Sequence, residues 1–303
     1  MKFFLTIILL SSTFVLAEPI TPIPTNIENI DKNKVKLGSK LFFDPILSKD
    51  GTVSCATCHD LNAGGVDGLQ FSIGIDGKVG DINSPTVFNA VYNFTQFWNG
   101  RARNLQEQAV GPIENHIEMG NTFENLIATL SNTPYKKDFE KIYSDGITKN
   151  NITDALAEFG KTLITPNAPF DKYLKGDEYA LTKSQKEGYE LFKSHGCIAC
   201  HHGINIGGNL YAKFGVMKDV KSKSLGRYEV TKNELDKYYF KVPTLRNIEL
   251  TSPYLHDGRI TELEEVVKFM SHFQLGKTLT DSDISKIVDF LKSLTGELIR
   301  YDQ

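Results

Sequence analysis

The chain has 303 residues, of which 40% are hydrophobic, so it can form two domains of ordinary size, each with a buried core. With a formal net charge of −3, nothing in the composition suggests the basic surface expected of a nucleic-acid-binding protein. The same value is compatible with a charged redox partner but does not identify one.

The first 17 residues are typical of a secretory signal peptide. Lys2 precedes an apolar stretch over residues 3–15, and Val15-Leu16-Ala17 ends in a small residue. The stretch is shorter than the roughly 20 residues that a membrane span needs. We therefore expect cleavage after Ala17, export to the periplasm and no membrane span in the mature chain.

A proline- and threonine-rich segment over residues 18–26 predicts an extended arm, and residues 34–43 predict a helix that ends before Pro45. The run Cys55-Ala56-Thr57-Cys58-His59 follows. This C-x-x-C-H spacing attaches a c-type haem: the two thiols bond the porphyrin, and the histidine becomes the proximal iron ligand. The glycine-rich stretch through Gly80 is expected to be mostly loop.

Apolar residues at helical spacing dominate the rest of the chain. They predict helices near residues 123–130, 152–163, 263–270 and 284–294, and a helix that leads into Cys197. Expected N-terminal caps are Thr122, Thr182 with Gln185, Thr261 with Glu264, and Thr280 with Asp283. Strand alternation is scarce, so the predicted fold class is mainly α.

The run Cys197-Ile198-Ala199-Cys200-His201 repeats the first motif and uses the remaining two cysteines. Two C-x-x-C pairs could instead bind one zinc ion through four thiolates or act as thioredoxin-like redox pairs. Zinc binding gives no reason for a histidine after both pairs, and a thioredoxin pair needs a βαβ context, which this sequence does not show. The pattern therefore favours two covalently bound c-type haems.

The expected architecture is two cytochrome c-like haem domains with long loops. The first spans residues 18–165 and the second residues 166–303, with a crossing segment over 166–176 and a final tail that can pack back on the first domain.

Many further segments resemble the bacterial dihaem cytochrome c peroxidases, within the wider family that includes the methylamine-utilisation dihaem oxidases. The matching segments are Leu41–Pro45, Gly64–Asp67, Asn83–Asn89, Gln96–Arg101, Gln108-Ala109, Ile117–Met119, Leu163–Asp171, Val242–Asn247, Pro253–Gly258 and Glu264-Glu265. The resemblance covers nearly all of the mature chain. It implies an enzyme that reduces hydrogen peroxide to water with electrons from a small cytochrome c or a similar donor.

The resemblance also implies a division of labour between the haems. The N-terminal haem meets peroxide, and the C-terminal haem takes in electrons. Glu118 matches a carboxylate that moves a proton between the peroxide oxygens, and Gln108 an amide that orients them. Trp98 matches a tryptophan on the electron path between the haems. A homodimer is also implied.

Five further positions are interpreted through the same resemblance. Met270 is expected as the sixth ligand of the second haem, where a thioether raises the reduction potential; its spacing alone would favour packing on a helix face. His256 matches a residue beside a haem propionate. Asn83, Thr251 and Pro253 match a calcium site made of an amide oxygen and two carbonyl oxygens.

One position departs from the family pattern. Where peroxidases that require reductive activation have a histidine that caps the peroxidatic iron, this chain has Ile75 after Ser72-Ile73-Gly74. The hypothesis is that the first haem is open to peroxide in the diferric state. His116 could substitute as a ligand or act as a base, or be a solvated loop residue. Two other functions remain possible: a dihaem electron carrier, and an oxidase that modifies a protein substrate, against which Met270 counts.

Overall fold

The computed structural model describes residues 19–299, so the expected signal peptide and the cleavage site after Ala17 lie outside the described residues. The fold is mainly helical, as predicted. The helices are α1 (Lys32–Phe43), α2 (Cys55–Cys58), α3 (Leu105–Glu114), α4 (Phe123–Ser131), α5 (Tyr135–Ile142), α6 (Lys149–Thr162), α7 (Pro169–Leu174), α8 (Lys183–His195), α9 (Tyr228–Thr231), α10 (Leu263–Phe273) and α11 (Asp281–Lys292). The strands β1 (Tyr211–Lys213) and β2 (Tyr239–Lys241) pair antiparallel.

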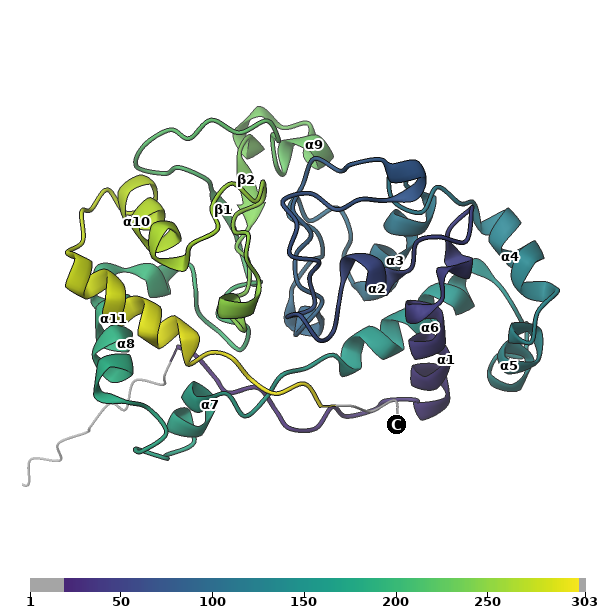
Figure 1. Cartoon of the computed structure of the whole chain (residues 1–303), viewed down its shortest axis with the longest axis horizontal. Coiled ribbons are helices and arrows are strands. Elements are labelled where there is room, and N and C mark those ends of the chain that lie inside the picture. The colour runs from purple at the N-terminus through teal and green to yellow at the C-terminus, as the bar shows by residue number, and fades with distance from the viewer. Residues whose placement is uncertain (1–18, 300–303) are drawn as a thin grey trace, which may run out of the picture.

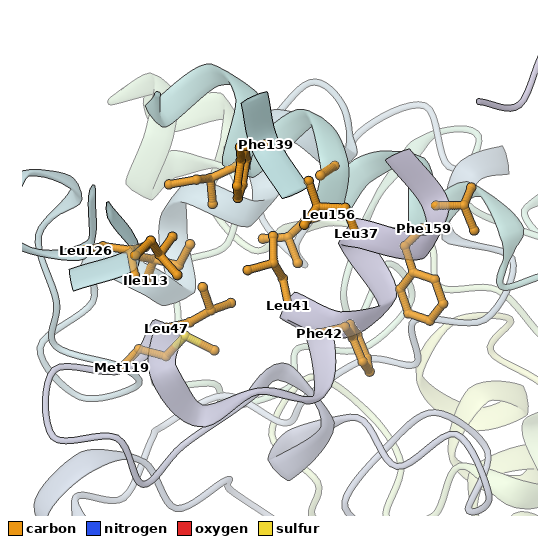
Figure 2. Close-up of a cluster of buried hydrophobic side chains, with 14 of the residues drawn as sticks. Leu37, Leu41, Phe42, Leu47, Ile113, Met119, Leu126, Phe139, Leu156 and Phe159 are labelled. Atoms are coloured by element: carbon orange, nitrogen blue, oxygen red, sulfur yellow. The ribbon is translucent and has the colours of Figure 1, made fainter. Parts of the chain in front are cut away.

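The helices form two lobes, an N-terminal lobe with α1–α6 and a C-terminal lobe with α7–α11 and both strands (Figure 1). The core of the N-terminal lobe is built around α1 and α6, and side chains of α3, α4 and α5 pack into it (Figure 2). A Cβ on Gly38 would come 1.9 Å from the carbonyl oxygen of Ala155, so glycine permits this close helix crossing. Phe42 and Phe159 meet edge to face with ring centroids 5.2 Å apart. A β-carbon at position 38 would therefore force the two helices apart.

The core of the C-terminal lobe repeats this arrangement with α8 and α11. Here a Cβ on Gly188 would come 1.9 Å from the carbonyl oxygen of Lys286. Phe290 on α11 packs against Tyr189 and Phe192 on α8, with ring centroids 5.1 and 5.2 Å apart. The two lobes thus share a plan in which a glycine allows one helix pair to cross closely.

The ends of the described chain cross between the lobes (Figure 1). Ile20, expected in the first domain, is fully buried in the core of the C-terminal lobe. Conversely, the segment after α11 runs towards the N-terminal lobe, where Leu298 packs against the core, and the amide of Ile299 donates to the carbonyl oxygen of Ile164. These contacts link the two lobes at both ends of the described chain.

Two equivalent turns meet where the lobes join. Asn89 and Asn247 both have left-handed backbone, with φ of 59° and 60°, and each precedes a short 3-10 helix. Both side-chain amides donate to the hydroxyl of Thr165, each over 2.8 Å. Phe97 and Leu255, in the following loops, also have positive φ. The junction is therefore built from a duplicated turn and loop around one central threonine.

Three of the four predicted N-terminal caps are confirmed. The hydroxyl of Thr182 accepts from the amide of Gln185 in a full capping box, and Thr122 and Thr280 cap α4 and α11. The cap at Thr261 is wrong: α10 begins at Leu263 behind Glu262, which makes no side-chain cap hydrogen bond. The expected crossing segment over residues 166–176 also contains the short helix α7, which was not predicted.

Candidate active site

The two cysteine pairs belong to different lobes. Cys55 packs against the N-terminal core, and Cys197 packs against the C-terminal core. Within residues 19–299, no three histidine, cysteine or carboxylate side chains come together in a way that could hold one metal ion. The alternative of a single zinc ion bound by four thiolates therefore does not fit this structure.

The local structure around each pair keeps the thiols neutral. Burial raises the pKa of Cys55 to about 12 and that of Cys58 to about 11, and it raises the pKa of Cys197 to about 11. Redox exchange of the thioredoxin type needs a thiolate with a lowered pKa, so these thiols do not fit that alternative. Thiols packed beside an apolar core fit covalent attachment to an apolar ring.

The two motif histidines are held in the same way. The Nδ1 atom of His59 donates to the carbonyl oxygen of Gly65 over 3.2 Å, and Nδ1 of His201 donates to that of Ile206 over 3.3 Å. A carbonyl oxygen can only accept, so Nδ1 carries the proton and Nε2 keeps a free lone pair for a metal. Burial lowers the pKa of both rings, that of His201 to about 4. Both histidines are therefore neutral, with Nε2 free to bind a metal.

A cavity in the C-terminal lobe tests whether a haem fits there. Cys197, Cys200 and His201 line it on one side, and Met270 from α10 lines it too. Apolar side chains of α8, α10 and α11 complete much of the wall: Phe192, Leu263, Val266, Val267, Ile287 and Leu291. An apolar enclosure that presents two thiols, an imidazole and a thioether fits a c-type haem, with His201 and Met270 available as ligands.

The polar end of this cavity reaches the junction of the lobes. The indole of Trp98 donates to the carbonyl oxygen of Asn83 over 2.9 Å, and its ring lies 6.2 Å from that of His256. His256 is buried, stacks on Phe240 at 4.2 Å, and its Nε2 shares a 2.7 Å hydrogen bond with the Ser222 hydroxyl. The structure thus brings Trp98 and His256 together, one from each lobe.

Glu118 lies beside the first cysteine motif. Its charge is among the causes that raise the pKa of both Cys55 and Cys58, behind burial. Burial raises the pKa of the Glu118 carboxyl, against the effect of a 2.6 Å hydrogen bond from the Asn115 amide and of the Arg101 charge. The Glu118 carboxyl is therefore held near the two thiols, where it can take up and release a proton.

Sequence reasoning did not assign roles to Asn115 and Arg101. The Arg101 guanidinium lies 3.4 Å from the ring centroid of Phe97, so it is fixed in place near Glu118. The Asn115 side chain also accepts from the amide of Ile117, a local turn that sets the position of Glu118. The Asn-x-x-Glu spacing is a sequence signal that could have indicated the contact between Asn115 and Glu118. The position of Arg101 near Glu118 depends on long-range packing and has no such signal.

The loop that carries Ile75 docks on the Glu118 segment. The amide of Ile75 donates to the carbonyl oxygen of Glu118 over 2.8 Å, and its side chain, 4% exposed, packs against Gly120. A Cβ on Gly74 would come 2.0 Å from the carbonyl oxygen of Ile117, so glycine allows this docking. His116, by contrast, has an exposed side chain. The position after Gly74 is therefore next to the candidate pocket.

The remaining predicted residues lie at two places. Gln108 is half-buried on α3, and no hydrogen bond between its side chain and Glu118 is found in the described part of the chain. Asn83, Thr251 and Pro253 all line the polar end of the cavity. The Asn83 amide nitrogen donates to the carbonyl oxygens of Leu69 and Gln70, which leaves its Oδ1 as the free acceptor. Amide and carbonyl oxygens are the kind of ligand that a hard cation prefers.

Comparison with known proteins agrees with this arrangement. The family model of di-haem cytochrome c peroxidase matches residues 32–179, and that of cytochrome c matches residues 185–295. A cytochrome c551 peroxidase of Nitrosomonas europaea is 49% identical over 92% of this chain and 85% of its own length. A cytochrome c peroxidase of Escherichia coli strain K12 is 51% identical over 94% of this chain, which spans only 63% of that relative's length.

A solved structure has the same fold. A MauG-like protein associated with microbial copper homeostasis superposes with a TM-score of 0.81 over 94% of this chain and 95% of its own, at 25% identity. Among the helices of residues 19–299, none has the length and apolar composition needed to cross a membrane. The two haem motifs, the two-lobe fold and the matched sequences lead to one conclusion: the chain belongs to the di-haem cytochrome c peroxidase family of oxidoreductases.

Proposed function

We propose that this protein is a cytochrome c peroxidase, which reduces hydrogen peroxide to water with electrons from a small cytochrome c or a similar one-electron donor. The observation that carries the proposal is the half-buried Glu118 carboxyl beside the first cysteine motif, whereas the cavity of the C-terminal lobe is lined by Met270 and by no aspartate or glutamate of the described residues. The first haem site then has a proton-transfer group, Glu118, and the second has a further iron ligand, Met270. This asymmetry fits peroxide chemistry at the first haem and electron entry at the second.

Glu118 is assigned the proton transfer. When bound, the haem supplies the electrons that cleave the peroxide O–O bond. A carboxylate oxygen of Glu118 accepts the proton from one peroxide oxygen, and the carboxyl returns it to the oxygen that leaves. The hydrogen bond from Asn115 holds this carboxyl in place, and Gln108 orients the substrate oxygens. Arg101 balances the carboxylate charge.

Trp98 and Met270 are assigned to electron delivery. Met270 and His201 would hold the second iron, and a thioether ligand would favour its ferrous form. Trp98 lies at the junction, where its indole is fixed by Asn83 and faces His256, so it is suited to couple the two sites. His256 would lie beside a propionate of the haem held in this cavity. That haem would supply a place to store one of the two electrons that each peroxide consumes, since the donors deliver one electron at a time.

Ile75 supports a finer proposal about activation. An aliphatic side chain at this position cannot ligate iron, and its loop is already docked against Glu118. The first haem is then open to peroxide in the diferric state. Electron paramagnetic resonance of the diferric protein should show a high-spin haem; a spectrum with only low-spin iron contradicts this point. His116, whose side chain is exposed, is then a solvated loop residue.

A calcium ion at the junction is the second finer proposal. The Oδ1 atom of Asn83 and the carbonyl oxygens of Thr251 and Pro253 are its ligands, completed by water. Chelation should lower peroxide turnover, and added calcium should restore it. Turnover that is unchanged after calcium removal, verified by metal analysis, is evidence against the site.

Location and assembly complete the proposal. We infer that the protein is exported and works in the periplasm, because the N-terminal residues up to Ala17 fit a signal peptide and covalent c-type haem attachment takes place outside the cytoplasm. The family resemblance further supports a homodimer. Cell fractionation and light scattering of the purified holoprotein test these two statements.

The decisive experiment is steady-state peroxide reduction by the diferric and half-reduced holoprotein, with a reduced small cytochrome c as donor. Glu118→Gln should lower turnover by about 10²–10⁴-fold, the usual contribution of a positioned acid–base group. Glu114→Gln is the matched control, because Glu114 is exposed and pairs with Lys149 at 3.3 Å. Wild-type protein without turnover in either redox state overturns the proposal and favours an electron carrier. Full turnover of Glu118→Gln overturns only the role of Glu118.

A further inference from the structure

Lys241, the last residue of β2, is a buried cation without a counter-ion. Its side chain is 5% exposed, and its ammonium makes no hydrogen bond or ion pair with any residue in the described range 19–299. Burial lowers its pKa to about 8, and no carboxylate of residues 19–299 acts on it. A desolvated charge costs several kcal/mol unless a partner compensates it. An anionic group from outside the chain is therefore expected beside this ammonium.

The cavity that Lys241 lines restricts what this anion can be. The same cavity presents Cys197, His201 and Met270, and its wall of α8, α10 and α11 side chains is apolar. Lys241 also lines this cavity, at the junction of the lobes, where its backbone contacts Trp98 of the Trp98–His256 pair. The ligand that fits is thus a largely apolar molecule with an acidic edge. A porphyrin bound through two thioethers, with its propionate edge towards the junction, has this chemistry.

The backbone fixes Lys241 at this position. The amide of Lys241 donates to the carbonyl oxygen of Trp98 over 2.8 Å, and the amide of Asn83 donates to that of His256 over 2.9 Å. These are reciprocal bonds: each lobe supplies one donor and one ring residue of the Trp98–His256 pair. Lys241 in the C-terminal lobe therefore occupies the position that Asn83 has in the N-terminal lobe. At these equivalent positions, Asn83 carries a neutral amide and Lys241 carries a fixed positive charge.

We propose that the Lys241 ammonium binds a propionate carboxylate of the C-terminal haem and thereby raises the reduction potential of that haem. The inference rests on the proposed function only in taking the cavity as the haem site. A fixed positive charge disfavours the extra positive charge of ferric iron, so it stabilises the reduced state. Lys241 acts through the porphyrin edge and is a positioning residue, separate from the iron ligands His201 and Met270.

The test is a redox titration of the C-terminal haem in purified holoprotein with Lys241→Met, Lys241→Gln and Lys241→Arg. The two uncharged variants should retain two haems in the pyridine haemochrome assay. Their equilibrium constant for reduction should fall at least tenfold, which is 59 mV for one electron. Lys241→Arg should stay within threefold of wild type. Lys223→Met is the matched control, because it removes the same charge from an exposed site, and it should leave the potential unchanged.

Each outcome decides the question. An uncharged variant with two haems and an unshifted potential overturns the proposal. If the uncharged variants accumulate with one haem and the arginine variant with two, the binding role is supported; if the arginine variant also loses a haem, side-chain size and not charge matters, and the proposal fails. Wild-type protein that holds two haems but lacks peroxide turnover overturns the proposed function alone, since the titration does not depend on turnover.

Discussion

The buried ion pair between Asp171 and Arg246 is expected to hold the C-terminal haem site in place. Arg246 Nη1 lies 2.6 Å from Asp171 Oδ1, and neither side chain is exposed. The guanidinium also donates to the carbonyl oxygens of Thr21 and Ile204 over 3.0 and 3.1 Å. The pair thus joins α7, the N-terminal arm and the loop in which the carbonyl oxygen of Ile206, two residues after Ile204, accepts from His201.

Asp171→Asn removes the negative charge and leaves the Arg246 guanidinium buried and uncompensated. Breaking a buried pair in this way costs about 3–5 kcal/mol. The geometry favours the lower half of that range, about 3–4 kcal/mol, because two carbonyl oxygens still accept from the guanidinium and the asparagine oxygen can still accept from the amide of Ile23. Replacing both partners, in Asp171→Asn with Arg246→Met, should cost less than Asp171→Asn alone, since no unpaired charge remains.

The assay is urea unfolding of the holoprotein, followed by circular dichroism and by the haem absorbance. Glu190→Gln is the control, because its pair with Lys193 is at the surface, with Glu190 70% exposed, and it should give no measurable change. A loss below about 1 kcal/mol for Asp171→Asn, the range of a surface pair, would refute the reasoning. So would a double variant that is less stable than Asp171→Asn.

Three further predictions follow from single positions. Gly188→Ala puts a methyl group 1.9 Å from the Lys286 carbonyl oxygen and should lower the free energy of unfolding by about 1–3 kcal/mol or more in the same urea assay. Gly80→Ala is its control and should cost less, because a Cβ there meets no atom closer than 3.7 Å. Ile75→His should turn a high-spin diferric signal into a low-spin one and lower diferric turnover, with recovery on half-reduction; an unchanged spin state contradicts this. Because burial raises the pKa of Glu118 above the usual 4.5, its carboxylate is lost as the pH falls through that raised value. Turnover should therefore decline on the acid side, and a decline of the same shape in Glu118→Gln would show that another group titrates.

The helices could be predicted because their signals are local. The Thr182 hydroxyl and the Gln185 side chain form a capping box within four residues, and the structure has it as expected. The equivalent expectation at Thr261 failed because tertiary contacts took over: the carbonyl oxygen of Thr261 accepts from the Ser252 hydroxyl, and α10 starts after Glu262. Local chemistry sets which segments are helical, and long-range contacts adjust where they begin.

How much of the candidate site could be predicted from the sequence differs from residue to residue. The C-x-x-C-H spacing identifies its five residues without any structure, since thioether attachment and ligation act within one turn. Glu118 and Met270 required the family resemblance, because nothing local distinguishes a functional glutamate or methionine from an ordinary one. The isolation of Lys241 could not be predicted, since it depends on every neighbour that the fold brings to the cavity.

The duplicated junction gives a physical origin for the difference between the two haem sites. Asn89 and Asn247 hold equivalent turns on the hydroxyl of Thr165, so the two lobes present the following loops in matching positions. Trp98 and His256 then occupy corresponding places, and so do Asn83 and Lys241, as their reciprocal backbone bonds require. In such a scaffold the backbone can stay the same while one side chain in each pair changes the local charge. The proposed division between a peroxide site and an electron-entry site would therefore need only a few substitutions at equivalent positions, without a second fold.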